Sequence, residues 1–365
     1  MFESFVSLLL NIPKLSIFTT TIDPAIDHYL VQPGYISQYY AMHIYQIVYV
    51  GIFYELLYLI SLYLIFPITF KLRIWMSDNL LDEFATTKPA TVKNATKTSD
   101  NNPLQSINLT QRNELITKLL KSDQQIAMHI VSLVQSLIIL ELCIKTIYKY
   151  QEYYFHWFNF SDLFQPAKLS QLTSHAHTRI FETTSENVVI CLMAAGYFLW
   201  DLFISMYCST LPFVMHGLVS FVVYSIGLKP FINYYACIFL IFELSNPFLN
   251  IRWFSIKYQF TPQNKNSTAK NPKKQSMVGN FLTKFFLINE VVFMLTFFNC
   301  RIVWGFVQIG LLINDFVIVR NDPRMDYLSA SIIVLGNFLL DILNVYWFQT
   351  MARIAYKKLV SAKKA

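Results

Sequence analysis

Asp201 and His216 are the pair of side chains in this sequence best placed to do chemistry together. They flank a short turn at about 209–211, nine residues before it and six after it. At 1.5 Å per helical residue, the two lie roughly 13 Å and 9 Å from the turn on antiparallel helices, so they can meet. A carboxylate beside an imidazole fixes its tautomer and raises its basicity, as general-base or nucleophilic catalysis requires. The same pair can equally serve as a buried hydrogen-bonded strut, and both interpretations stay open.

A second polar group occurs where an apolar segment ends, in the run Glu-Leu-Ser-Asn-Pro-Phe-Leu-Asn-Ile-Arg-Trp from Glu243 to Trp253. An ionised side chain at the centre of a bilayer costs about 3 kcal/mol on insertion scales, so it normally faces the interior of a helix bundle. Arg301 also lies within an apolar segment and needs a partner. Glu243 or Asp341 would supply one, and a structural ion pair is the favoured role.

Polar residues recur at helical spacing in the other apolar segments, as at 129 and 132 and again at 337, 341 and 344, so each set lies on one face. The residues predicted to line a lipid cavity or to support it are His129, Ser132, Glu243, Ser245, Asn250, Arg252, Arg301, Asn337, Asp341 and Asn344. Asp201, His216 and Glu243 together lack a diagnostic ligand spacing, so neither a metal site nor a cofactor is predicted.

The elements that carry these residues are predicted from hydropathy. The 365-residue chain is 55% hydrophobic and only 14% charged, which excludes a soluble domain and predicts an all-α polytopic membrane protein. A span needs about 20 apolar residues. Seven segments meet that length: 42–70, 125–147, 188–208, 211–228, 231–253, 285–313 and 327–351. The longer apolar run 281–319 is interpreted as one span containing Arg301.

Basic residues predict the orientation. Segments 71–124, 252–284 and 352–365 hold 20 of the 29 Lys and Arg residues, which places these segments in the cytosol. The N-terminus is then lumenal and the C-terminus cytosolic, as an odd number of spans requires. The basic excess is explained by this topology and by an anionic leaflet, so no nucleic-acid partner is predicted.

The predicted organisation has five parts: a lumenal segment 1–41, a first transmembrane helix 42–70, a cytosolic linker 71–119, a helical domain 120–351 and a basic cytosolic tail 352–365. Stretches 84–111 and 262–276 are rich in Asn, Lys, Thr and Ser, so they are predicted to be disordered.

Four motifs resemble the TLC domain family, which includes ceramide synthases, translocon-associated membrane proteins and smaller proteins of lipid homeostasis. These are Gly-Tyr-Phe-Leu-Trp-Asp ending at Asp201, Met-His-Gly-Leu around His216, the Glu243 to Trp253 run and Asn-Cys-Arg-Ile around Arg301. The resemblance covers about 120–351 and is nearest to the small TLC-domain proteins of the transmembrane protein 56 type. It implies six helices in a ring around a central lipid-accessible cavity, preceded here by one extra span, and residence in the endoplasmic reticulum.

Two classes of function follow from the resemblance. The favoured one is a protein that binds or handles membrane lipids or acyl chains without ceramide synthase activity. The alternative is an acyltransferase that uses His216 as base or nucleophile, Asp201 as its orienter and acyl-coenzyme A as substrate. Ceramide synthases carry two adjacent histidines where this chain reads His216-Gly217, which favours the first class. The lipid and the oligomeric state do not follow from the sequence.

Overall fold

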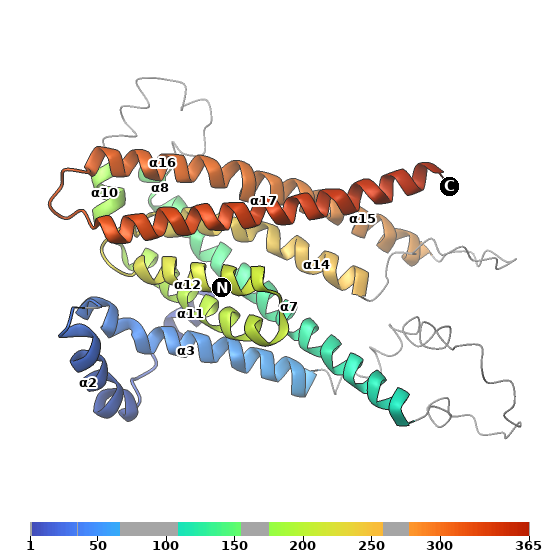
Figure 1. Ribbon diagram of the computed structural model, residues 1–365, viewed down its shortest axis with the longest axis horizontal. Helices are drawn as coiled ribbons and strands as arrows, with labels where there is room; N and C mark the ends of the chain where they lie inside the picture. Colours follow the sequence, from blue (N-terminus) through green and yellow to red (C-terminus); the bar gives the residue numbers. More distant parts are fainter. Residues whose placement is uncertain (1, 35, 66–108, 155–174, 258–276, 365) are drawn as a thin grey trace, which may run out of the picture. The chain divides into compact units, whose positions relative to one another are not determined.

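The structure is a computed structural model that describes residues 2–34, 36–65, 109–154, 175–257 and 277–364. Every regular element in these ranges is a helix, and five of the helices there are long and apolar enough to cross a membrane (Figure 1). The predicted all-α polytopic membrane fold is therefore confirmed.

The five long apolar helices coincide with predicted spans. They are α3 (Gln38–Ile60) with its π-helical end η3 (Ser61–Ile65), α7 (Leu109–Lys149), α11 (Ser185–Cys208), the continuous run α15 (Met277–Phe297), η7 (Phe298–Val303) and α16 (Trp304–Val319), and α17 (Tyr327–Lys364). The shorter described helices are α1 (Phe2–Leu10), η1 (Phe18–Ile22), α2 (Asp23–Ile26), η2 (Asp27–Val31), α8 (Gln151–Tyr154) and α10 (Ala176–Phe181).

The other two predicted spans are less regular. Helix α12 (Leu211–Ile226) has 16 residues, about 24 Å of helix, against a hydrocarbon layer of about 30 Å. The segment predicted at 231–253 consists of α13 (Tyr235–Phe239), the 3-10 helix η6 (Leu240–Ser245) and α14 (Asn246–Lys257). Seven crossings therefore remain a prediction, of which five are supported by long apolar helices.

The 3-10 stretch η6 has a local cause. Pro247 follows Asn246 at the start of α14, and its ring would collide with the carbonyl of residue 243 in a regular α-helix. The backbone before the proline tightens instead, as 3-10 turns do at helix ends. This irregular turn carries Glu243 and Ser245, two of the predicted polar residues.

The apolar run around Arg301 is one continuous helical segment, as predicted, with a π-helical turn at Phe298–Val303 that contains Arg301. Two helices extend beyond the predicted membrane-length segments. Helix α7 begins at Leu109, within the predicted linker, and α17 continues to Lys364 through the predicted tail. Residues 71–108 of the linker and the stretch 262–276 lie outside the described residues.

Contacts divide the described chain into two units, each considered by itself below. The first comprises 1–56, 133–247 and 292–365, and the second comprises 57–132 and 248–291. In the first unit α11 packs along α12, and α12 packs against α17 (Figure 1). Thr184 caps α11 by accepting a hydrogen bond from the backbone nitrogen of Asn187, and Pro212 opens α12 at a position where a proline costs no helical hydrogen bond.

Candidate functional site

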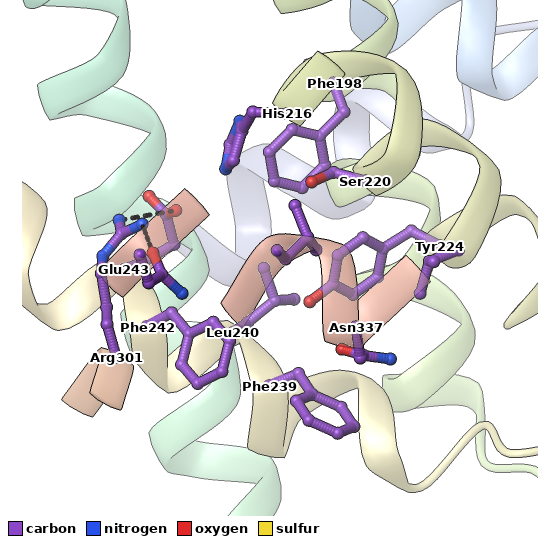
Figure 2. A pocket seen from close by; sticks show the side chains of 13 residues that line it. Phe198, His216, Ser220, Tyr224, Phe239, Leu240, Phe242, Glu243, Arg301 and Asn337 are labelled. Atoms are coloured by element: carbon purple, nitrogen blue, oxygen red, sulfur yellow. Dashed lines mark hydrogen bonds and ion pairs between the residues drawn. The ribbon is translucent and has the colours of Figure 1, made fainter. Parts of the chain in front are cut away.

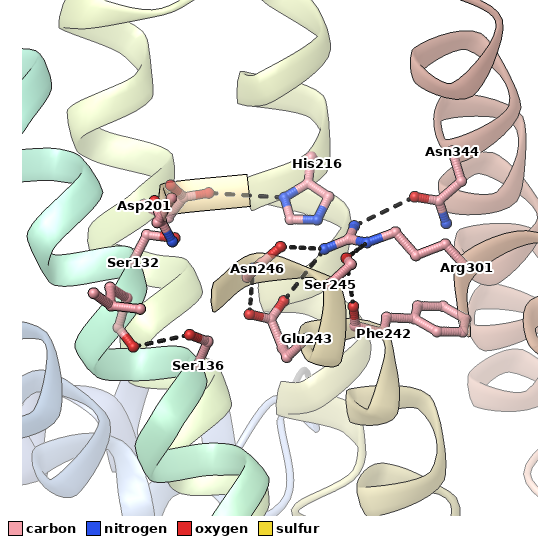
Figure 3. A network of polar contacts seen from close by, with 12 residues as sticks. Ser132, Ser136, Asp201, His216, Phe242, Glu243, Ser245, Asn246, Arg301 and Asn344 are labelled. Atoms are coloured by element: carbon pink, nitrogen blue, oxygen red, sulfur yellow. Dashed lines mark hydrogen bonds and ion pairs between the residues drawn. The ribbon is translucent and has the colours of Figure 1, made fainter. Parts of the chain in front are cut away.

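Arg301 is the centre of a buried polar network in the first unit (Figure 3). Its Nε donates to Ser245 Oγ at 2.9 Å and its Nη2 donates to Asn246 Oδ1 at 2.7 Å. A longer bond joins Nη1 to Asn344 Oδ1 at 3.4 Å, and Glu243 Oε1 lies 3.8 Å from Nη2. The guanidinium is thus shared among several weak or moderate partners rather than held by one carboxylate.

Most members of this network lie at irregular parts of their helices. Glu243, Ser245 and Asn246 follow one another on η6 and the start of α14, whereas Arg301 lies on the π-turn η7. The amide nitrogen of Asn246 donates to Glu243 Oε2, and its oxygen accepts from Arg301, so Asn246 links the two charged side chains. Arg301 is 6% exposed and Glu243 5%. Because both charges are removed from water, losing either member leaves the other uncompensated.

The predicted neighbours Asp201 and His216 are found close together. Asp201 Oδ2 lies 3.8 Å from His216 Nδ1, and each side chain is about one-fifth exposed. This separation is too long for a direct hydrogen bond, although it allows electrostatic orientation of the ring. Phe198 and Trp347 pack beside the imidazole, with ring centroids 5.6 Å and 5.7 Å away. The pair can act as a base and its orienter only after a small closing movement.

Gly217 explains how α11 and α12 approach so closely at this point. A Cβ atom at 217 would lie 3.0 Å from both the Cα and the nitrogen of Leu202, and 3.3 Å from Asp201 Oδ2. The nearest atoms belong to the α11 backbone, which cannot rotate away as a side chain can. A second histidine at this position would therefore require the two helices to separate, so the resemblance to ceramide synthases ends here for a physical reason.

A small cavity lies between these two polar groups, and it has walls of mixed character (Figure 2). Phe198, Tyr224 and Phe239 supply aromatic surface. Its polar lining residues are His216, Ser220, Glu243, Arg301, Asn337 and Asn344. The cavity volume is about 30 Å³, and a water needs about 10–15 Å³ of such space, so about two waters fit. An acyl chain enters only if the lining side chains move.

The predicted polar residues separate into three groups. Glu243, Arg301, Asn337 and Asn344 line the cavity. Ser245 and Asp341 are buried within the same unit, 0% and 2% exposed. The remaining four, His129, Ser132, Asn250 and Arg252, belong to the second unit. Their role in lipid binding remains a prediction.

The second unit has a polar cluster of its own around His129. Its Nδ1 lies 2.7 Å from Asn250 Oδ1, and the Asn250 amide contacts Ser132 Oγ at 3.4 Å. The His129 ring stacks on Trp253 with centroids 4.1 Å apart. Arg252 Nε lies 3.8 Å from Glu290 Oε1 in the same unit. The Glu243 to Trp253 run thus supplies residues to two separate polar clusters.

Sequence reasoning missed a second buried arginine in the first unit. Arg179 on α10 binds both carboxylate oxygens of Asp315 on α16, at 2.7 Å and 2.8 Å. Tyr235 donates its hydroxyl to the same carboxylate at 2.7 Å. An aspartate near the end of the apolar run 281–319 was a usable signal for one partner. Arg179 gave no signal because it lies in a short polar segment outside every predicted span.

Residues 125–353 match the family profile described as the TLC domain. An uncharacterized TLC domain-containing protein of Saccharomyces cerevisiae is 36% identical over 352 residues, which are 96% of this chain and 95% of that protein. Topoisomerase I damage affected protein 4 of the same yeast is 33% identical over 196 residues, 52% of this chain and 63% of that protein.

A TLC domain-containing protein of Schizosaccharomyces pombe, also described as uncharacterized, is 27% identical over 180 residues, 48% of this chain and 54% of that protein. No solved structure matches the chain. The profile spans more than half of the sequence, over the helices that hold both polar groups of the first unit. Together with the likeness to the first yeast protein along almost its whole length, this match establishes that the chain belongs to the TLC domain family.

Proposed function

We propose that this protein binds or handles membrane lipids and contributes to membrane lipid homeostasis without ceramide synthase activity. The main support for this proposal is the cavity beside Arg301, which combines aromatic walls with ionisable side chains. It lies among helices that are apolar enough to span a membrane. Ionisable residues at such positions are expensive and usually functional. Pockets that hold amphipathic ligands combine apolar walls with a few fixed polar groups in this way.

The small volume of the cavity indicates how binding would proceed. A lipid chain needs the walls to open, and two of those walls are the irregular turns η6 and η7. Such 3-10 and π segments inside long helices are frequent at hinges and functional sites. The polar network around Arg301 would then hold a headgroup or a carbonyl, while Phe198, Tyr224 and Phe239 contact the chain.

The alternative function is an acyltransferase in which His216 acts as base or nucleophile and Asp201 orients it, with acyl-coenzyme A as substrate. The position of His216 on the cavity wall favours it, and the 3.8 Å separation of the two side chains requires only a small closing movement. The tight packing at Gly217 counts against a ceramide synthase mechanism, because the second histidine of that mechanism has no space.

The deciding experiment is purification in a mild detergent, followed by mass spectrometry of bound lipids and an N-acylation assay with a sphingoid base and acyl-coenzyme A. His216→Ala is the test variant. His28→Ala is its control, because His28 is an exposed histidine outside every predicted span. We expect a lipid to co-purify without turnover and His216→Ala alone to alter its retention. N-acylation by the wild type that is lost in folded His216→Ala protein would establish the acyltransferase instead.

We also propose that the protein resides in the endoplasmic reticulum with its C-terminus in the cytosol. The orientation is supported by the basic residues, 20 of 29 of which fall on one side in this topology. A C-terminal epitope should react with antibody after selective permeabilisation of the plasma membrane. A C-terminal epitope that reacts only after the internal membranes are also opened would reverse the topology.

A further inference from the structure

Asp341 is a buried carboxyl group that the proposed lipid site does not use. It lies within α17, is 2% exposed, and both of its side-chain oxygens lack a hydrogen-bond partner among the described residues. An ionised carboxylate in that state is far more costly than a neutral acid, and such groups take up a proton instead. Most buried polar atoms in proteins have a partner, so these two oxygens require an explanation.

Helix α16 packs closely against one side of Asp341. A Cβ atom at Gly305 on α16 would lie 2.7 Å from Asp341 Oδ1 and 3.2 Å from Cζ of Phe242. The carboxyl group therefore lies close to the α16 backbone at Gly305, and a larger residue there would displace it. In the described part of the chain no three His, Cys, Asp or Glu side chains gather as metal ligands would. A proton needs neither additional ligands nor additional space, so it is the cation that fits this site.

The charged groups on the elements packed against α17 explain why no partner is available. Arg301 on η7 is occupied by Glu243 and its neighbours, and Asp315 on α16 is held by Arg179. His216 on α12 lies near Asp201. Each charge that could stabilise an ionised Asp341 is thus already engaged in the structure.

Asn344 places a member of the Arg301 network on the same helix as Asp341. It lies three residues further along α17, on the same face, and accepts a hydrogen bond from Arg301 Nη1 (Figure 3). Asn337, four residues before Asp341, lines the cavity together with Asn344. Water in that cavity provides a path for a proton to reach this face of α17.

We propose that Asp341 is a proton-binding site within the membrane, neutral when Arg301 pairs with Glu243. Loss of the proton to cavity water would leave an unpartnered buried carboxylate on the helix whose Asn344 accepts a hydrogen bond from Arg301. The site therefore couples proton binding to the state of the Arg301 network. This inference does not depend on the identity of any lipid.

The test is infrared difference spectroscopy of the purified protein, which separates the carbonyl stretch of a protonated carboxylic acid from the carboxylate bands. Aspartates in water are ionised at about pH 7, so an acid band there marks an unusual group. We expect the wild type to show this band and Asp341→Asn to lose it. Asp326→Asn is the control, because Asp326 is more than one-third exposed and lies outside the spans, and it should keep the band.

Two further measurements keep the inference testable if Asp341→Asn fails to fold. Labelling the aspartate side-chain carboxyl with carbon-13 should shift the wild-type acid band without any substitution. With the labelled aspartate, Glu243→Gln should reduce the shifted band, a result that excludes Glu243 itself as the source of that band. Absence of an aspartate acid band from the wild type at about pH 7 would overturn the proposal, as would a band that survives in folded Asp341→Asn protein.

Discussion

The first unit contains two buried arginines whose surroundings differ. Arg179 is held by both oxygens of Asp315 at 2.7 Å and 2.8 Å, and Tyr235 donates its hydroxyl to the same carboxylate at 2.7 Å. Arg301 is 3.8 Å from Glu243 and depends on three amide or hydroxyl acceptors. A bidentate pair is geometrically specific, whereas a shared guanidinium can exchange partners at lower cost.

The two surroundings fit a structural role for Arg179 and the proposed lipid site for Arg301. The Arg179 cluster ties the short helix α10 to α16, and none of its three residues lines the cavity described above. The Arg301 network lies on two irregular helical turns and forms part of the cavity wall. A buried arginine is thus held by a geometrically specific pair at Arg179, whereas the partners of Arg301 can rearrange more easily.

The largest expected effect comes from breaking the rigid pair. Arg179→Leu leaves the Asp315 carboxylate buried without its cation, so we expect a loss of about 3–5 kcal/mol in the free energy of unfolding. The measurements are steady-state protein level and thermal unfolding in detergent. Replacing Arg179 and Asp315 together by leucine should restore much of the loss. An unchanged melting temperature in the single variant would refute the structural assignment.

A smaller loss is expected for the shared arginine. Arg301→Leu should cost about 3 kcal/mol, because the Asn246 amide still satisfies part of the Glu243 carboxylate. Combining it with Glu243→Gln should be less harmful than Arg301→Leu alone, and a double-mutant cycle gives their coupling. Protein level and retained lipid are measured in parallel. Damage equal to or above the sum of the singles would show that the two side chains are not coupled.

Gly217→Ala tests whether close packing of α11 and α12 shapes the region around Asp201 and His216. The added methyl group meets the Leu202 backbone at 3.0 Å, so we expect a loss of about 1–3 kcal/mol from overpacking. Thermal unfolding provides the measurement, with Gly310→Ala as the control because no heavy atom lies within 4 Å of a Cβ there. Equal melting temperatures for the two variants would contradict the packing argument.

The smallest effect concerns the exposed turn before α17. Hydrogen bonds from Arg324 hold the pKa of Asp322 below its ordinary value. A depressed pKa contributes stability above the unfolded-state value of about 3.9, and the contribution is lost as pH falls through the folded-state pKa. The melting temperature of Arg324→Gln should therefore lie slightly below that of the wild type near neutral pH and approach it in acid. A gap that widens as pH falls would reverse the assigned sign.

The sequence by itself determined the membrane class, the positions of the long apolar helices and the family. These follow from local hydropathy and from motif residues such as Asp201, His216 and Arg301, which need no knowledge of packing. It also predicted that Asp201 could meet His216 and that either Glu243 or Asp341 would pair with Arg301, because short turns and buried charges restrict the partners. Both approaches are found at 3.8 Å.

Only the tertiary structure decided how these charges are shared and which positions cannot change. The bidentate pair of Arg179 with Asp315 joins residues 136 positions apart, a separation that helical periodicity does not constrain. The missing partner of Asp341 and the lack of space beside Gly305 and Gly217 depend on how closely helix backbones approach. Packing of this kind is set by the whole assembly of helices, so no local sequence pattern could have revealed it.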